Sequence, residues 1–292
     1  MHISEINIYP IKSCRGIAVM SAAVEARGIS RDRRWLVTDR DGKFLTQREI
    51  PKLATITVRM RGDGIAVRVD GAPPLDVDPL MQGPLVTAQV FSSTSEAIEY
   101  DVNTNEWFSD VLGTGAKLLY MPDNAGRPVN PRFNRGGELV SFADGYPLMV
   151  LGEASLAALN GRMADHESEA GTLGAFQPLP MNRFRPNLVV SGSTAFAEDD
   201  WSRIMIGDAV FRSTKPSERC VMTTVDQSRG EFAGKEPLRT LATFRVAREV
   251  MPERCEPLGI TPTAVIFGQN LIPETPGVTI RVGDPVKVLA NK

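Results

Sequence analysis

Residues 215–226 read K-P-S-E-R-C-V-M-T-T-V-D and combine a structural with a chemical signal. The polar, proline-bearing start is typical of a loop, and the β-branched run from Val221 to Val225 predicts a strand after it. Cys220 stands where loop becomes strand, so its backbone is held while its thiol can stay accessible. Arg219 and Lys215 favour the thiolate, the form that binds a metal or attacks carbon. A free cysteine is also a common buried core residue, so a purely structural role stays open at this point.

Composition narrows the classes of function. The 292 residues, 42% of them hydrophobic, suffice for one large or two ordinary domains, and the net charge of -2 gives no overall attraction to nucleic acid or to an anionic membrane. Cys14, Cys220 and Cys255 are odd in number and lack C-x-x-C spacing, which argues against a disulfide framework and an iron–sulfur cluster. His2 and His166 leave little room for a zinc site or a Ser-His-Asp triad. With no apolar run long enough to span a membrane, we expect a soluble, cytoplasmic protein.

The hydrophobic pattern indicates a β-rich chain with a few helices. Short alternating runs separated by Asp-Gly turns over residues 53–77 predict β-hairpins. Residues 104–112 predict a helix, in which the leading threonine can start the helix and the glycine behind it can end it. Helical spacing recurs over residues 153–163, whereas residues 165–179 lack periodicity and are expected to form a surface loop.

Three cationic turns lie beside predicted strand ends, at residues 12–15, 31–34 and 183–185. Ammonium, guanidinium, hydroxyl and backbone N–H groups together suit an anion. In the second turn, strand alternation sends Arg33 and Arg34 to opposite faces, so one of the two is expected to meet a ligand or an acidic partner. Taken alone, the first of these turns would more often be a solvated surface turn, whereas the arginines of the second exceed what solubility requires.

Convergence of these turns near Cys220 would build a site for an anionic, phosphate-bearing ligand that faces a thiolate. A soft sulfur ligand suits a thiophilic metal. The sequence contains no Walker-type loop, no G-x-G-x-x-G and no evident acid–base pair, which disfavours phosphoryl transfer, nicotinamide binding and simple hydrolysis.

Seven segments, in this order along nearly the whole chain, resemble the MOSC proteins, which are named after the C-terminal domain of molybdenum cofactor sulfurase, together with the β-barrel-like domain that precedes it. The likeness is greatest to the mitochondrial amidoxime-reducing component and to bacterial relatives that detoxify N-hydroxylated bases. The matching segments are YPIKSCRG (9–16), RDRRWLV (31–37), FADGYP (142–147), FRPNLVVSG (184–192), RCVMTTVD (219–226), EPLRTL (236–241) and FGQN (267–270).

The resemblance implies a molybdenum cofactor, a complex of molybdenum with molybdopterin, for which Cys220 is the metal ligand and the catalytic residue. The matched contacts to the pterin and phosphate are Lys12, Ser13 and Arg33 from the first half and Arg185 and Asn187 from the second. Further candidate cofactor contacts are Gly145, Tyr146, Glu218, Arg219, Asp226 and Asn270.

Some of these positions depart from the family pattern. Gly145 and Tyr146 stand where the mitochondrial relatives carry hydroxyl residues, and Glu218 stands where they carry serine. Backbone contacts can survive such changes, but side-chain contacts do not carry over. Asp226 and Asn270 are expected to orient the residues that contact the cofactor.

For the fold, the resemblance implies two β-barrel-like domains, residues 1–122 and 123–290, with the cofactor in the cleft between them. For activity, it implies a two-electron reduction of the N–O bond in amidoximes, hydroxylamines and N-hydroxylated bases, in the service of detoxification. The chain lacks the clustered cysteines of an appended ferredoxin-like domain, so we expect no iron–sulfur cluster of its own and a separate electron-transfer protein or reductase as donor. Beyond that donor and a small N-hydroxylated substrate, neither nucleic acid nor a membrane is an expected partner.

Two other functions fit the same residues. A cofactor carrier or sulfur-handling protein would bind or sulfurate the cofactor through Cys220 without turning over a substrate. A non-catalytic β-barrel binding module would simply bury that thiol.

Overall fold

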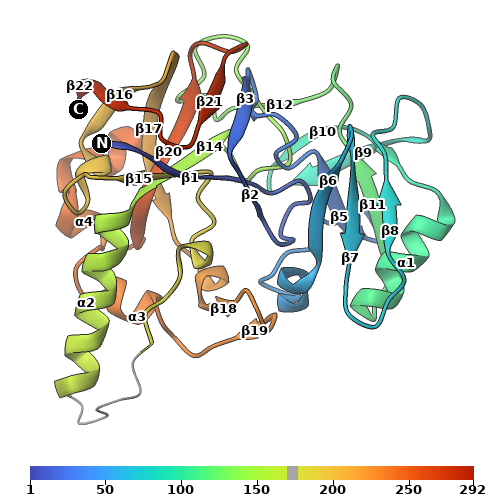
Figure 1. The fold of residues 1–292 in the computed structure, drawn as a ribbon, viewed down its shortest axis with the longest axis horizontal. Coiled ribbons are helices and arrows are strands. Elements are labelled where there is room, and N and C mark those ends of the chain that lie inside the picture. The colour runs from blue at the N-terminus through green and yellow to red at the C-terminus, as the bar shows by residue number, and fades with distance from the viewer. Residues whose placement is uncertain (170–176) are drawn as a thin grey trace.

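The computed structural model describes residues 1–169 and 177–292, which form many strands and a few short helices (Figure 1). This confirms the β-rich α+β fold. The surface loop expected over residues 165–179 is wrong in its first part, because α2 (Glu153–Glu169) continues to its end at Glu169. The segment 170–176 of that expectation lies outside the described residues.

An eight-stranded sheet joins the two ends of the chain. In spatial order its strands are β2 (Ile17–Val19), β1 (His2–Ile8), β15 (Leu188–Ser191), β14 (Leu148–Gly152), β20 (Ile266–Pro273), β17 (Ala209–Glu218), β16 (Trp201–Ile206) and β22 (Val286–Asn291). Strand β1 pairs antiparallel with both β2 and β15, so the first strand of the chain completes a sheet made mostly by the last half. Its isoleucines, Ile3, Ile6 and Ile8, are buried in the core of that sheet.

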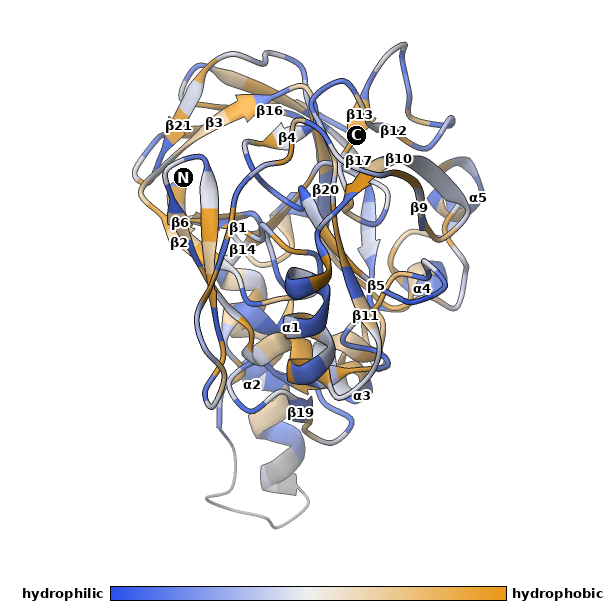
Figure 2. Ribbon diagram, turned by 90° about the vertical axis from the view of Figure 1, so that its right-hand side faces the viewer, coloured by the Kyte–Doolittle hydropathy of each residue, from blue (hydrophilic) through white to orange (hydrophobic). Residues whose placement is uncertain are grey.

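A three-stranded sheet packs against the same core. It consists of β21 (Thr279–Arg281), β3 (Ser21–Glu25) and β4 (Gly28–Ile29), again one strand from the end of the chain and two from its beginning. Apolar residues such as Val24 and Ile280 point into the shared core. Several strands carry apolar residues beside polar ones, and many of the loops are hydrophilic (Figure 2). The central strands β14 and β20 are buried along nearly their whole length.

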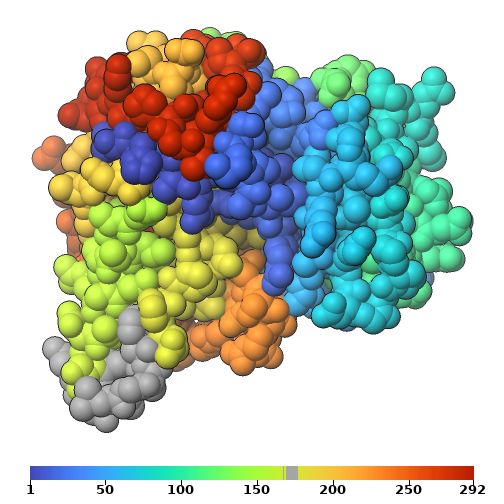
Figure 3. Space-filling view, in the orientation of Figure 1, coloured from blue at the N-terminus to red at the C-terminus, as the bar shows by residue number. Residues whose placement is uncertain are grey.

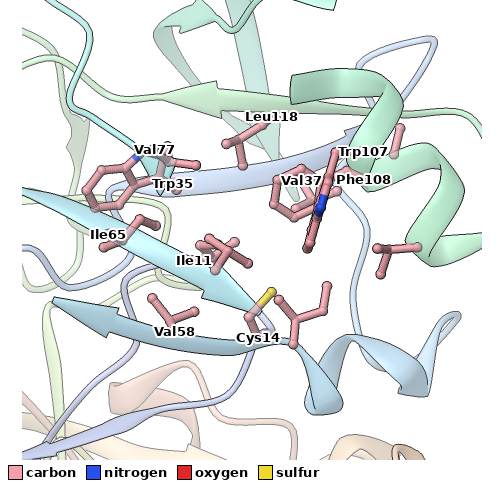
Figure 4. Packing of buried hydrophobic residues seen from close by; sticks show 14 of the residues in the cluster. Ile11, Cys14, Trp35, Val37, Val58, Ile65, Val77, Trp107, Phe108 and Leu118 are labelled. Carbon is pink, nitrogen blue, oxygen red and sulfur yellow. The ribbon is translucent and has the colours of Figure 1, made fainter. Parts of the chain in front are cut away.

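The chain between residues 35 and 120 forms a second unit with its own core (Figure 1). One sheet has the order β5 (Trp35–Asp39), β11 (Ala116–Tyr120), β10 (Ser93–Glu99) and β9 (Leu85–Val90), and a second sheet holds β6 (Thr57–Arg61), β7 (Gly64–Arg68) and β8 (Leu75–Val77). The second sheet confirms the predicted hairpins from Thr57 onward, whereas residues 53–55 belong to a 3-10 turn. Trp35, Ile65, Phe108 and Leu118 meet in the core, and the Trp35 indole donates to the Tyr100 hydroxyl at 2.8 Å (Figure 4).

Short elements complete the chain. Two small ladders are β12 (Arg127–Pro128) with β13 (Leu139–Val140) and β18 (Val225–Asp226) with β19 (Glu231–Phe232). The other helices are α1 (Val102–Leu112), α3 (Leu238–Leu241), α4 (Ala247–Val250) and α5 (Cys255–Leu258), and the 3-10 turns are η1 (Pro51–Thr55), η2 (Met181–Arg183), η3 (Ala197–Asp199), η4 (Val221–Thr224) and η5 (Pro252–Arg254).

Strand pairing crosses the division that we expected after residue 122. β1 to β4 precede the division but lie in sheets with strands that follow it. In the space-filling view, the segments near the N-terminus accordingly lie against the last strands, while the middle of the first half forms the other side of the molecule (Figure 3). The N-terminal segment therefore fixes the position of the two units relative to each other.

Helix α1 begins before the residue that the sequence suggested. Asp101, not Thr104, is the N-cap, and its carboxylate accepts from the backbone N–H groups of Asn103 and Thr104 at 2.9 and 3.0 Å. Two backbone donors at the helix start are thereby satisfied. These bonds hold the pKa of the Asp101 carboxyl below its usual range. Gly113 ends the helix in the left-handed conformation, as predicted.

We expect Asp101→Ala to lower the free energy of unfolding by about 1 kcal/mol, because it removes the cap. Urea denaturation followed by circular dichroism measures the change. Asn103→Ala is the matched control: its side chain is exposed and its backbone N–H remains, so we expect a change within about 0.5 kcal/mol. Equal stability of Asp101→Ala and the wild type would contradict the assigned helix start.

Candidate functional site

A cavity of about 470 Å³ lies between the two units. All but one of the predicted site residues line it: Lys12, Ser13, Arg33, Gly145, Tyr146, Arg185, Asn187, Glu218, Arg219, Cys220 and Asn270. The lining contains seven cationic side chains (Lys12, Arg33, Arg48, Arg183, Arg185, Lys215 and Arg219) and two carboxylates (Asp144 and Glu218). The three cationic turns therefore converge on one strongly positive cavity, although the whole chain carries a formal charge of -2.

Backbone strain concentrates at this cavity. The described residues include six non-glycine residues with positive φ, and four of them, Ser13, Arg33, Phe91 and Arg185, line the cavity. Non-glycine residues adopt this conformation at an energetic cost, and such residues cluster at functional sites. The strain therefore singles out this cavity as the candidate functional site.

A buried tyrosine holds two of the arginines together. The guanidinium carbons of Arg33 and Arg185 lie 4.5 and 4.3 Å from the centroid of the Tyr9 ring. The Tyr9 hydroxyl donates to the carbonyl of Pro186 at 3.0 Å, which ties the first turn of the chain to the strand entrance at β15. Burial raises the pKa of Tyr9 to about 12, so the ring stays neutral and can carry both cations.

Asn187 connects three segments of the chain next to these arginines. Its side-chain oxygen accepts from Arg33 Nη1 at 2.8 Å, and its side-chain nitrogen donates to the carbonyl of Asn7 at 3.1 Å. Its backbone N–H donates to the carbonyl of Met149 at 2.9 Å. Arg33 also pairs with the buried Asp32. Arg33 from the first half and Asn187 from the second, both expected to contact a cofactor, are thus in direct contact.

The second cationic turn divides its arginines between different tasks. Arg33 faces the cavity, whereas Arg34 lies on the other side and pairs with Asp123 at 2.7 Å. Arg31 pairs with the exposed Asp63. We expected one of these two neighbours to meet a ligand or an acidic partner; Arg33 lines the cavity, and both arginines pair with an aspartate.

Lys12 and Asp144 form an ion pair inside the cavity. The Asp144 loop is held from behind by the buried Arg127, which donates to the carbonyls of Ser141, Ala143 and Asp144 at 2.7 to 2.9 Å. Burial would raise the pKa of the Asp144 carboxyl, but the Lys12 ammonium and the Arg48 guanidinium outweigh it and lower the pKa to about 2. Burial lowers the pKa of the Lys12 ammonium, and Asp144 opposes part of that shift.

Cys220 lies at the start of a 3-10 turn rather than a strand. The strand predicted for Val221 to Val225 is wrong in its first four residues, which form η4. The hydroxyls of Thr223 and Thr224 donate to the carbonyls three residues earlier, at 3.0 and 2.8 Å, and these local bonds favour a tight turn over a strand. The cysteine itself is half-buried and lines the cavity.

Two arginines flank the Cys220 thiol. Burial would lower the pKa of Arg48, but Cys220 and Asp144 beside it raise the pKa above its ordinary value. Burial lowers the pKa of Arg219 to about 10, although Cys220 opposes this shift. Arg219 donates to the carbonyl of Phe184 at 2.8 Å, while its Nε is buried without a hydrogen-bond partner in the described structure. The environment of the sulfur is therefore cationic.

The positions that depart from the family pattern remain compatible with an anion. Glu218 pairs with Lys215, which neutralises the carboxylate at the cavity wall. A Cβ atom added at Gly145 would meet nothing within 4 Å. The Tyr146 hydroxyl is buried without a hydrogen-bond partner in the described structure, and burial raises its pKa. Asn270 donates to the carbonyl of Lys215 at 3.1 Å and so holds the end of β17.

Asp226 is the predicted site residue that the structure does not bring to the cavity. Its carboxylate accepts from the backbone and hydroxyl of Ser228 and from the backbone of Arg229, within its own turn. The Ser228 bonds hold its pKa at about 2 despite burial. Its place in the structure is that of a turn-stabilising residue.

Sequence reasoning missed several lining residues, of which Arg48, Asp144 and Phe91 carry the most chemistry. Asp144 stands within the segment FADGYP, so the resemblance contained a signal for it. Arg48 stands in the polar stretch T-Q-R-E, and Phe91 in a hairpin loop. Nothing in those two local patterns indicates a site.

Comparisons with known proteins identify the two domains of the chain. Residues 1–115 match the MOSC N-terminal beta barrel domain, and residues 138–287 match the MOSC domain. The chain belongs to the MOSC family. This confirms the resemblance drawn from the seven sequence segments, and both matched domains contribute to the cavity wall.

Three relatives illustrate the family. The chain is 33% identical to mitochondrial amidoxime reducing component 2 of Bos taurus, over 97% of this chain and 82% of the relative. It is 32% identical to mitochondrial amidoxime-reducing component 1 of Homo sapiens, over 99% of this chain and 82% of the relative. It is also 32% identical to molybdenum cofactor sulfurase of Oryza sativa subsp. japonica, over 84% of this chain but 31% of the sulfurase.

The relatives also correct one expectation. We expected a cytoplasmic protein, whereas the relatives that cover nearly the whole chain are mitochondrial by name. Within residues 1–169 and 177–292, no helix is long and apolar enough to cross a membrane.

The Lys12–Asp144 ion pair should be detectable in the titration of the Asp144 carboxyl. Because Asp144 has a lowered pKa, the pair should stabilise the fold above about pH 4, the ordinary pKa of aspartate, and lose this effect as the pH falls towards about 2. In carbon-13 NMR, the Asp144 carboxyl carbon should titrate at a higher pH in Lys12→Met than in the wild type. Lys43→Met removes an exposed lysine outside the cavity and should leave the titration unchanged. An unaltered Asp144 titration in Lys12→Met would refute the pair.

Proposed function

We propose that this protein is a molybdenum-cofactor-dependent reductase of N-hydroxylated compounds, which takes electrons from a separate electron-transfer protein. The observation that carries the proposal is a thiol, Cys220, in a cavity with seven cationic side chains and two carboxylates. The family relationship supports it, because relatives that match nearly the whole chain are named amidoxime-reducing components.

The residues present fit such a cofactor. An excess of cations, formed by convergent turns, suits a phosphate group and an anionic pterin complex. The buried and unpartnered Nε of Arg219 offers a further donor at the wall. A volume of about 470 Å³ falls within the range of small-molecule sites.

The metal donors fit as well. The described part of the chain holds no group of three or more His, Cys, Asp or Glu side chains that could chelate a metal. A metal bound at Cys220 would then take its other donor atoms from the cofactor that carries it. Thiolate sulfur suits a thiophilic metal, and a pterin cofactor with sulfur donors meets this requirement.

Each part of the cavity has a role in this proposal. Lys12, Arg33 and Arg185 would hold the phosphate and pterin, and Cys220 would bind the metal. When bound, the cofactor supplies the two-electron redox chemistry of the overall reaction, R–NH–OH + 2e⁻ + 2H⁺ → R–NH₂ + H₂O. Arg48 and Arg219 place two guanidinium groups beside the sulfur.

A cofactor carrier or sulfur-handling protein is the second candidate. The match to the molybdenum cofactor sulfurase favours it, because that relative handles the same cofactor by name. Both candidates predict stoichiometric molybdenum in protein expressed with molybdate. Reduction of benzamidoxime or 6-hydroxylaminopurine with a chemical electron donor distinguishes them, because a carrier would bind the metal without turnover.

We expect Cys220→Ala to abolish N–O reduction but to retain most of the pterin, because the anion contacts lie elsewhere in the cavity. Turnover and the fluorescence of the released, oxidised pterin measure the two effects. Cys255→Ala is the matched control, since Cys255 is buried in a separate apolar cluster and should leave turnover per folded protein unchanged. Wild-type turnover in Cys220→Ala would refute the ligand assignment.

We expect Arg185→Met to lower the cofactor content of purified protein about ten- to a hundredfold, the effect of losing one charge-assisted hydrogen bond. Methionine keeps an apolar stem against Tyr9, so the fold should persist. Arg31→Met replaces another arginine with positive φ, outside the cavity, and should retain the cofactor. Equal cofactor content in the two variants would contradict the role of Arg185 in anion binding.

A further inference from the structure

The β9–β10 hairpin carries a strained aromatic residue at its tip. Val90 pairs with Ser93, so Phe91 and Ser92 form a two-residue loop. Such loops need positive φ and favour Asn or Gly, yet Phe91 adopts this conformation with φ 54°. A bulky residue with positive φ is a conformational outlier, and outliers of this kind point to a role for the side chain.

Packing into the core does not explain the strained conformation of Phe91. Its neighbour Val90 is fully buried, whereas Phe91 is 47% exposed. The ring stands edge-on to Phe44, with centroids 5.1 Å apart and planes at 67°. The Gln89 side-chain amide also donates to the Phe91 carbonyl at 2.7 Å. The ring is thus held in a defined place while part of its surface stays open to solvent.

Phe91 is linked to Cys220 through a single side chain. The guanidinium carbon of Arg48 lies 5.3 Å from the centroid of the Phe91 ring. The same guanidinium lies 3.8 Å from Asp144 and beside Cys220. Phe91, Arg48 and Cys220 all line the same cavity, to which the loop after the cysteine adds Met222. An exposed aromatic surface therefore lies within the site, close to the Cys220 thiol.

We propose that Phe91 determines substrate specificity by stacking on the planar, conjugated part of N-hydroxylated substrates such as aryl amidoximes and N-hydroxylated nucleobases. The proposal rests on the reductase function and narrows its substrate class. Offset or edge-to-face contacts between aromatic rings stabilise a complex beyond the area that they bury. A small aliphatic substrate with the same N–O group offers no ring and gains no such contact.

Benzamidoxime and acetamidoxime form a matched pair of probes, because they share the reacting group and differ in the ring. Phe91→Asn removes the aromatic side chain and supplies a residue that the turn favours, so the hairpin should remain folded. Calorimetry on cofactor-loaded protein without an electron donor gives dissociation constants, and assays with a donor give KM. For benzamidoxime we expect about tenfold weaker binding and a higher KM, because one aromatic contact contributes a free energy of about that size. Both values for acetamidoxime should stay within about twofold.

Phe91→Tyr is the control that keeps the ring, and it should bind benzamidoxime like the wild type. Unchanged benzamidoxime binding in Phe91→Asn, or equal weakening for both probes, would overturn the role of Phe91 and leave the reductase function intact. A cofactor-loaded wild type that reduces neither probe would refute the reductase function and this inference with it.

Discussion

The site depends on holding like charges together next to a buried aromatic ring. Arg33 and Arg185 both lie against Tyr9, from segments more than a hundred residues apart in sequence. Two guanidinium groups in a partly buried place repel each other unless other charges compensate. The ring, the buried Asp32 and the amide of Asn187 provide part of this compensation. A bound anion would supply the remaining negative charge. The cavity is therefore preorganised to bind an anion.

The position of the first strand makes this arrangement possible. Because β1 lies between β2 and β15, the turn that follows β1 is fixed beside the entrance of β15. Tyr9 thereby contacts Arg185, and Lys12 lines the same cavity as Arg185 and Asn187. The two matched domains share this sheet, and a site at their junction inherits the rigidity of the strands.

The sequence and the structure differ where local bonds compete with a residue pattern. The β-branched residues after Cys220 read as a strand, but the hydroxyls of Thr223 and Thr224 bond back to the chain and produce a 3-10 turn. Thr104 read as a helix start, whereas Asp101 caps the helix because its carboxylate reaches two backbone donors. Residue propensities give the wrong secondary structure mainly where a side chain can hydrogen-bond to the nearby backbone.

By itself, the sequence determined the β-rich fold class, the family and the residue types of the site: one cysteine in a distinctive segment and cations at three strand ends. These features are local or lie in contiguous motifs. Only the tertiary structure decided which cations face the cavity, that Asp226 stays in its own turn, and that Arg48, Asp144 and Phe91 join the site. Those outcomes depend on pairing between distant strands and on turns with positive φ, which bring together residues that no local pattern relates.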